Sequence, residues 1–181
     1  MVAYVIIPGI DGSDDQHWQS LWERGWGTAA VRTSPASWSA PDLDDWLNAV
    51  QTAYDTASRK DERVMLVAHS LGCWAASEWL RKNPASLPGG AFLVAPPDPQ
   101  GPAFPSTAAA TFTGLSARPL PCPALVVGSS NDPYADEDTV AGFAAGWEAC
   151  WHLAGALGHV NSASGLGAWP QGRELLKSWS M

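Results

Sequence analysis

One stretch of the sequence decides the fold: Val64-Met65-Leu66-Val67-Ala68-His69-Ser70-Leu71-Gly72-Cys73. Residues 63–68, which are apolar from Val64 onward, predict a strand buried on both faces, and residues 71–81 have helical spacing. Ser70 lies between them, with Ala68 and Gly72 two positions away on either side. A sharp strand-to-helix turn brings these two positions against each other, so both side chains must be small. The stretch therefore predicts a nucleophile elbow with Ser70 at its tip.

This turn would suit Ser70 for nucleophilic catalysis. The hydroxyl would project from the top of the sheet, and the following helix would point its N-terminal N–H groups at a developing oxyanion. Ala68 stands where the usual G-x-S-x-G pattern has its first glycine. The alternative is that Ser70 only caps the helix. Capping does not require small residues on both sides, which favours the elbow.

Strands and helices alternate along the rest of the chain. Apolar runs predict further strands. Residues 41–54 carry an amphipathic stripe, which predicts a helix. The other expected strands are residues 2–7, 29–33, 91–95, 124–128 and 148–153; the other expected helices are 17–26, 41–54, 139–147 and 173–179. Such alternation implies βαβ units and a parallel sheet. We expect an α/β fold of the α/β-hydrolase type, a three-layer sandwich with a mostly parallel sheet of about six strands.

The segment 96–123 would connect two of these strands. It is rich in proline, which prevents a long amphipathic helix, so we expect no lid domain there. No domain boundary is evident, and residues 1–181 are expected to form one domain.

Composition and charge narrow the choice of partner and compartment. The net charge is −8, which disfavours nucleic acid and anionic membrane surfaces. The first apolar run is too short for a signal sequence or a membrane span. The three cysteines, Cys73, Cys122 and Cys150, form no C-x-x-C pair, and their odd number suits a reducing compartment. We expect a cytoplasmic protein.

A nucleophilic serine needs a base, and the chain has four histidines. His159, in Gly158-His159-Val160-Asn161, follows the last expected strand and therefore lies at the carboxyl-end edge of the sheet, where ligands bind in this fold class. His69 lies in the elbow itself and must point elsewhere. His152 falls inside a strand, and His17 begins a helix. His159 is the predicted base.

The base in turn needs an acid to fix its tautomer. Asp132 follows the strand at 124–128 and so reaches the same edge of the sheet. Asp136 and Asp138 are rivals, but they stand where a helix begins, a common position for acids. Asp132 is therefore predicted, and the chain order Ser, Asp, His is that of α/β-hydrolases.

The same edge would supply an oxyanion hole. Leu71 N–H is the expected first donor, and Ile10 N–H, in the loop after the first strand, is the expected second, with Asp11 as an alternative. This glycine-rich loop lacks G-x-G-x-x-G, so no dinucleotide cofactor is expected. No H-E-x-x-H spacing occurs, and no metal is expected.

Eleven tryptophans are the oddity of the composition. For any one of them a place in the core is the more common outcome. Trp18 and Trp74 nevertheless stand beside the motifs, and together with His17 they are the expected substrate-binding residues.

Four segments resemble the small serine hydrolases of the retinoblastoma-binding-protein-9 type. They are Ile6-Ile7-Pro8-Gly9 with Gly12-Ser13 and His17-Trp18-Gln19; Ala68-His69-Ser70-Leu71-Gly72; Ser129-Ser130-Asn131-Asp132-Pro133-Tyr134; and Gly158-His159-Val160-Asn161. The resemblance spans nearly the whole chain. It implies a compact α/β-hydrolase without a lid and places the triad on Ser70, Asp132 and His159. It supplies no substrate.

The expected function is hydrolysis of carboxylic esters, or of small amides, through an acyl-enzyme, with a small-molecule substrate and no cofactor. The alternative is a non-catalytic interaction protein that keeps the fold. The sequence gives no indication of the oligomeric state.

Overall fold

The computed structural model describes residues 1–86 and 88–180. Within them one sheet contains six strands in the order β2-β1-β3-β4-β5-β6, and every pairing is parallel. The strands are β1 Ala3–Ile7, β2 Ala30–Arg32, β3 Val64–His69, β4 Gly90–Val94, β5 Ala124–Gly128 and β6 Cys150–Leu153. The α-helices are α1 Trp18–Trp26, α2 Leu43–Ser58, α3 Leu71–Lys82, α4 Glu137–Gly146 and α5 Pro170–Trp179.

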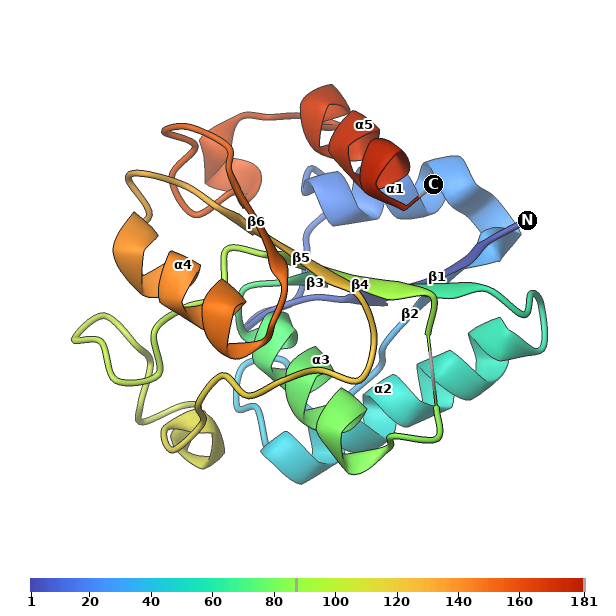
Figure 1. Ribbon diagram of the computed structural model, residues 1–181, viewed down its shortest axis with the longest axis horizontal. Coiled ribbons are helices and arrows are strands. Elements are labelled where there is room, and N and C mark those ends of the chain that lie inside the picture. The colour runs from blue at the N-terminus through green and yellow to red at the C-terminus, as the bar shows by residue number, and fades with distance from the viewer. Residues whose placement is uncertain (87, 181) are drawn as a thin grey trace.

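Five helices cover the two faces of this sheet (Figure 1). Helices α1 and α5 pack on one face against side chains that include Ile6, Val67 and Phe92. Helices α2, α3 and α4 pack on the other, against neighbours such as Leu66 and Leu93. Successive strand residues point to opposite faces, so both sides of the central strands must be apolar. This is the predicted three-layer sandwich.

The strand register brings three loops together at one edge of the sheet. Ile7 at the end of β1 pairs with Ala68, and His69 at the end of β3 pairs with Val94. The loops that leave β1, β3 and β4 therefore start side by side. The carboxyl ends of parallel strands are where open α/β sheets bind their ligands.

All the strands and helices expected from the sequence are present, and the largest displacements are at helix ends. Helix α5 begins at Pro170, three residues before the predicted start. Proline suits the first helical position, because its missing N–H would have no partner there and its φ is already helical. Helix α2 continues to Ser58, beyond the apolar stripe that predicted it.

The segment between β4 and β5 contains no α-helix. One 3-10 turn, Ala110–Phe112, is its only helical element. Phe104 and Phe112 are buried and belong to the core cluster that includes α2 and α3. The largest side chains of the segment thus anchor it to the body of the protein, and no lid is present.

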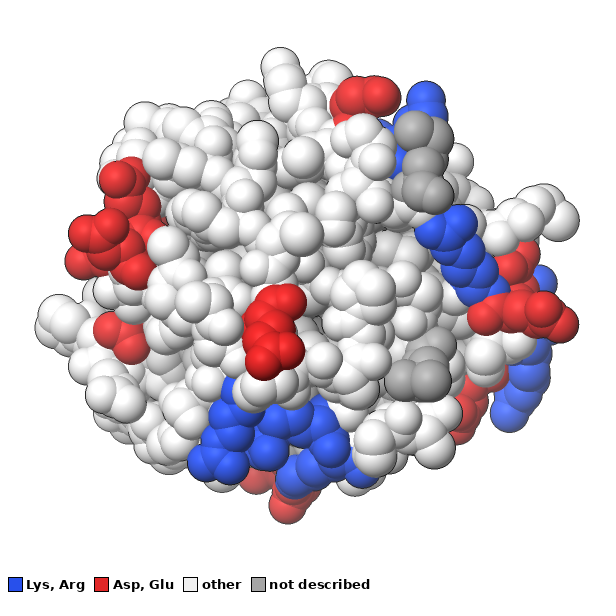
Figure 2. All heavy atoms as spheres, in the orientation of Figure 1, with Lys and Arg blue, Asp and Glu red and all other residues white. Residues whose placement is uncertain are grey.

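The charged side chains are sparse. On the face shown in Figure 2, small, separate clusters of both signs stand on a mostly uncharged surface, in keeping with a charged fraction of 15%. In the part of the chain that the structure describes, no helix has the length and apolar character needed to cross a membrane.

Candidate active site

Ser70 occupies a strained turn between β3 and α3. Its backbone has φ 54° and ψ −128°, values that a residue with a side chain rarely adopts, and Ser70 N–H donates to Val94 O at 2.9 Å. Such a conformation costs on the order of 1–3 kcal/mol and persists only where the surroundings enforce it. The Ser70 side chain makes no capping hydrogen bond to the helix. The structure therefore has the predicted elbow and does not support the capping alternative.

The small residue after the serine is a steric necessity. A Cβ at Gly72 would lie 2.3 Å from Ile7 O and 2.6 Å from Pro8 O. The first turn of α3 thus packs directly on the backbone where β1 ends. Any side chain at Gly72 would push the elbow away from the loop that follows β1.

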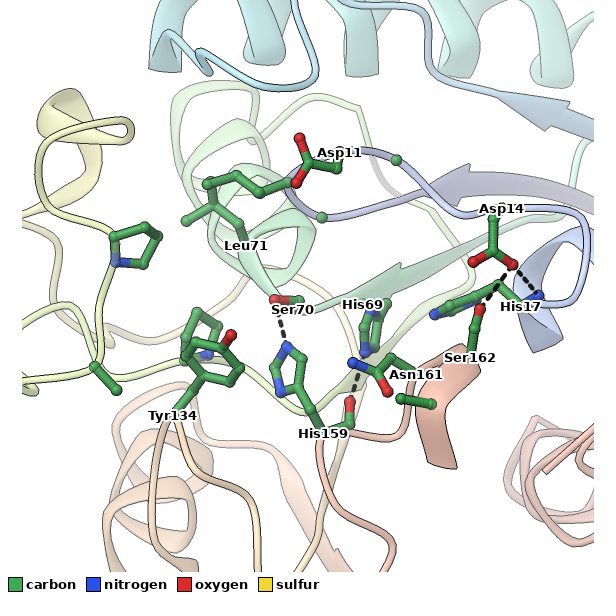
Figure 3. Close-up of a pocket in the computed structure, with 17 residues that line it drawn as sticks. Asp11, Asp14, His17, His69, Ser70, Leu71, Tyr134, His159, Asn161 and Ser162 are labelled. Atoms are coloured by element: carbon green, nitrogen blue, oxygen red, sulfur yellow. Dashed lines mark hydrogen bonds between the residues drawn. The ribbon is translucent and has the colours of Figure 1, made fainter. Parts of the chain in front are cut away.

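Ser70, His159 and Asp132 form a continuous hydrogen-bonded chain, of which Figure 3 shows the bond between Ser70 and His159. His159 Nε2 lies 2.8 Å from Ser70 Oγ, and His159 Nδ1 lies 3.0 and 2.9 Å from the two carboxylate oxygens of Asp132. A carboxylate only accepts, so Nδ1 carries the proton and Nε2 is left to accept from the serine hydroxyl. The side chain of Asp132 is 1% exposed. The three residues predicted from separate motifs are brought together in the geometry that activates a serine.

The rival acids are placed elsewhere. Asp136 caps α4 by accepting from Thr139 N–H at 2.8 Å. Asp138 lies in the first turn of the same helix and is exposed. Both therefore have the helix-terminal positions that made them poorer candidates.

Trp18 and His69 fix the loop that carries His159. Trp18 Nε1–H donates to Val160 O at 2.8 Å, and His69 Nε2 lies 2.8 Å from His159 O, to which it must donate. Val160 has φ 49°, so the loop is held in a tight turn. The backbone of the base is thus bonded to both α1 and β3.

A second set of bonds joins the loops after β5 and β6. Asn131 Oδ1 accepts from Gly158 N–H at 2.7 Å and from Ser129 Oγ–H at 3.0 Å. Ser129 Oγ in turn accepts from Leu157 N–H at 2.9 Å. The sequence analysis missed Asn131 and Ser129 as positioning residues. Their only signal was their place just before Asp132, in one of the segments that resemble the family.

The expectation that Trp18 and Trp74 contact substrate needs correction. Neither lines the cavity: Trp18 is 1% exposed and Trp74 is fully buried. The Trp74 indole N–H donates to Pro97 O at 2.8 Å, as the Trp18 indole does to Val160 O. Both residues lie next to a motif in the sequence and therefore near the site. Their positions on α1 and α3, however, direct both side chains into the core.

The cavity above Ser70 has a volume of about 510 Å³. Ser70 and His159 open into it. The other lining residues come from the loop after β1, from His69, from the β4–β5 segment and from the loop after β6, including Ile10, Leu71, Pro97, Pro105, Tyr134 and Asn161. Of the three expected substrate-binding residues, His17 is the one in the cavity wall.

The two expected oxyanion donors, Leu71 and Ile10, both line the cavity. Leu71 is the first residue of α3, where a helix has N–H groups without intrahelical acceptors. A Cβ on Gly9 would lie 2.8 Å from Ser70 Cβ, so the backbone just before Ile10 passes directly beside the serine. Asp11 N–H donates to Trp38 O at 2.9 Å, so this N–H group already has an acceptor. Of the two alternatives in this loop, the geometry thus favours Ile10.

His17 combines a structural role with an unsatisfied group. Its Nδ1 accepts from Gln19 N–H at 3.1 Å and caps α1, so the proton of the neutral ring must be on Nε2. That Nε2 is buried and has no hydrogen-bond partner among the described residues. A buried donor without a partner costs about 1–3 kcal/mol.

Two histidines of the site are held neutral by burial. Burial lowers the pKa of His17 to about 4 and holds the pKa of His69 well below its usual range. The rings of His17, His69 and His159 form a row, with centroids 4.7 and 5.0 Å apart along it. Neutral His17 and His69 add no positive charge next to His159, the predicted base, which would become positive if it took a proton from Ser70.

Stability is expected to fall in acid because of His17. A histidine in the unfolded chain has a pKa near 6.5. Between that pH and about pH 4, His17 therefore binds a proton in the unfolded chain but not in the folded one. The contribution is therefore present above about pH 6.5 and is lost as the pH falls, by about 3 kcal/mol at pH 4. Urea unfolding measured from pH 7 to pH 4 checks this. His17→Asn, which keeps a capping oxygen but does not titrate, should weaken the dependence, and an identical dependence in that variant would count against it.

Comparisons with known proteins show the family of this chain. The family model of the serine hydrolases matches residues 4–178. The chain belongs to the serine hydrolase family. A YdeN-like hydrolase from Pectobacterium atrosepticum is 30% identical, with a TM-score of 0.84 over 99% of this chain and 91% of that one. Comparison with curated proteins gave no significant match.

More distant structures share the fold of this serine hydrolase. The ydeN gene product from B. subtilis is 22% identical, with a TM-score of 0.78 over 98% of this chain and 97% of that one. Est1E from Butyrivibrio proteoclasticus is 11% identical, with a TM-score of 0.72 over 100% and 90%. These neighbours establish the α/β-hydrolase fold expected from the sequence.

Proposed function

We propose that this protein hydrolyses carboxylic esters through a covalent acyl-enzyme on Ser70. The observation that carries the proposal is the unbroken hydrogen-bonded chain from Ser70 Oγ through His159 to the buried carboxylate of Asp132. A cavity open at the serine gives a substrate access to this chain.

In the first step Ser70 Oγ attacks the ester carbonyl carbon while His159 Nε2 takes the hydroxyl proton. Asp132 stabilises the imidazolium that forms, and the N–H groups of Leu71 and Ile10 would receive the developing oxyanion. His159 then returns the proton to the departing alcohol. In the second step His159 Nε2 takes a proton from water while the water oxygen attacks the acyl carbon. The bond from that carbon to Ser70 Oγ then breaks, His159 returns the proton to Ser70 Oγ, and the acid is released.

Two finer assignments remain part of this proposal. The four segments that resemble hydrolases of the retinoblastoma-binding-protein-9 type, among them Ala68-His69-Ser70-Leu71-Gly72, support a place in that group. A cytoplasmic location is supported by the cysteines: Cys73, Cys122 and Cys150 are all free in the structure.

The activity is tested with p-nitrophenyl esters and matching anilides, assayed with the wild type and Ser70→Ala in parallel. We expect saturable hydrolysis of short esters by the wild type. If the wild type were no faster than Ser70→Ala on any substrate, the alternative of a non-catalytic interaction protein would replace this proposal.

The acyl preference should be for short chains. The cavity wall contributed by the β4–β5 segment consists of Pro97, Ala103 and Pro105, while Phe104 and Phe112 face the core. Full burial of one methylene would gain ~0.8 kcal/mol, which corresponds to about fourfold in kcat/KM. Without a long apolar slot, each added methylene should raise kcat/KM by far less than this.

This preference is measured as kcat/KM from p-nitrophenyl acetate to palmitate, below and above the solubility limit of the longer esters. A steady rise with chain length, or a jump when the substrate aggregates, would reveal an acyl tunnel or interfacial activation and would contradict the expected preference.

A further inference from the structure

The cavity extends to both sides of Ser70, and its two ends differ in chemistry. Figure 3 shows Tyr134 on one side of the serine; Asp14, His17, Asn161 and Ser162 lie on the other. We call these four residues the polar end. The β4–β5 segment adds only proline and alanine to the cavity wall. A substrate bound at Ser70 would therefore place one of its two arms, acyl or alcohol, in the polar end.

The polar end contains a buried donor that the fold leaves unpaired. His17 is 3% exposed, and its ring points from α1 toward His69 and the middle of the cavity (Figure 3). Nδ1 is occupied by Gln19 N–H, so Nε2 carries the hydrogen, and Nε2 has no partner among residues 1–86 and 88–180. Capping α1 needs only Nδ1, so the cap does not explain why a donor is kept at this wall.

Asn161 offers a second donor beside it. Its side-chain oxygen accepts from Ser164, within a capping box that shapes the loop after His159. The amide NH₂ is therefore the end of the side chain available to the cavity, which Asn161 lines. Two neutral donors in one wall match an acceptor without a hydrogen of its own, such as a carbonyl oxygen.

The charge of this end favours a neutral acceptor over an anion. The Asp14 carboxylate accepts from Ser162 Oγ–H at 2.8 Å and from His17 N–H at 3.0 Å. The hydrogen bond from Ser162 lowers the pKa of Asp14, which keeps it ionised. With a negative group here, neutral His17 and a net charge of −8, a substrate carboxylate would be repelled.

We infer that the polar end binds a neutral carbonyl oxygen of the substrate, such as that of an amide, with His17 Nε2–H as the donor. This inference rests on the proposed hydrolysis at Ser70. It names a substrate class, esters with an amide carbonyl a few atoms from the reacting carbon, and it makes His17 a determinant of specificity.

Two matched pairs of esters test it, one for each arm. The acyl pair is p-nitrophenyl N-acetylglycinate and p-nitrophenyl pentanoate, and the alcohol pair is 2-acetamidoethyl acetate and pentyl acetate. Within each pair the chain has the same length, and only one member carries the amide carbonyl. Because Ser70 lies between the two ends, the pair that responds also identifies the arm in the polar end.

Two variants separate the two nitrogens of His17. His17→Asn places an oxygen near the position of Nδ1, keeps the cap and removes the Nε2 donor. His17→Gln places an amide nitrogen near Nε2 and removes the cap. The measured quantity is the kcat/KM of the amide-bearing ester divided by the kcat/KM of its alkyl partner. In at least one pair, we expect this ratio to fall about 3- to 10-fold in His17→Asn. In His17→Gln the ratio should stay within about twofold of the wild-type value.

Only this pattern supports the inference. An unchanged ratio in His17→Asn, a fall confined to His17→Gln, or an equal fall in both would overturn it and leave His17 as a cap. If the wild type hydrolysed none of the four esters, the proposed function itself would fail. Should both variants unfold, the wild type labelled with ¹⁵N-histidine can be treated with two pairs of phosphonates. One pair bears an acetamidomethyl or a butyl group on phosphorus, and the other bears a 2-acetamidoethyl or a pentyl group as the retained ester. In at least one pair the Nε2–H resonance of His17 should move downfield with the amide-bearing reagent alone, and equal spectra within both pairs would overturn the inference.

Discussion

Replacing Ser70 with alanine is expected to lower kcat/KM for a short ester by about 10³-fold or more. The variant loses the only oxygen that lies in hydrogen-bond contact with His159 Nε2 among the described residues, so no acyl-enzyme can form. The oxyanion donors and the cavity stay, which leaves some residual rate enhancement. Both kcat and kcat/KM should fall together, because the lost interaction belongs to the transition state.

The fold of this variant should survive, because Ser70 makes no capping bond and alanine keeps the Cβ. Ser77→Ala is a matched control. Ser77 lies on α3, the helix that follows Ser70, is 1% exposed and donates to Trp74 O, away from the cavity. Comparable losses of activity in the two variants, or a Ser70→Ala protein with substantial hydrolysis, would show that the hydroxyl of Ser70 is not the reacting group.

Asp132→Asn is expected to be nearly as damaging, although it preserves the shape of the side chain. Asparagine can present its NH₂ group to His159 Nδ1, which would then have to accept; Nε2 would carry the proton and could not take one from Ser70. The same change in a serine protease costs about 10⁴-fold in kcat, which sets the scale. Because the carboxylate is buried, water cannot replace it as the partner of the imidazole.

Asp136→Asn and Asp138→Asn are the controls for this effect. Asparagine is as good a cap as aspartate, so Asp136→Asn should keep both the stability of α4 and the activity within a few-fold, and the exposed Asp138 should matter as little. Steady-state kinetics and thermal unfolding of the three variants check the assignment. A severe loss in either control with a mild loss in Asp132→Asn would show that the acid had been assigned to the wrong residue.

The sequence predicted the features that depend on local pattern. Continuous apolar runs such as the one before His69 indicate buried parallel strands. The carboxyl ends of parallel strands lie at one edge of the sheet, so the loop after each strand must begin there. Ser70, Asp132 and His159 lie in the connections that follow β3, β5 and β6, so their meeting at one edge of the sheet could be inferred from the sequence. Steric need is also local: Gly72 was recognisable because no larger residue fits the turn.

The remaining features depend on contacts between distant segments. The bond from Asn131 to Gly158 joins two loops 27 residues apart, and nothing in either loop alone reveals it. Trp18 and Trp74 were placed in the pocket because of their neighbours in sequence, whereas the side of the helix on which each stands turns them inward. The unpaired nitrogen of His17 appears only once every possible partner has a position.

The central claim, that Ser70 is the covalent nucleophile, is tested most directly by labelling with a fluorophosphonate probe. The wild-type protein is treated with the probe, digested and mapped by mass spectrometry, with Ser70→Ala and Ser77→Ala treated in parallel. We expect one labelled site, on the peptide that contains Ser70, which is retained in Ser77→Ala and absent from Ser70→Ala. Labelling that persists in Ser70→Ala, or that maps to another residue in the wild type, would contradict it.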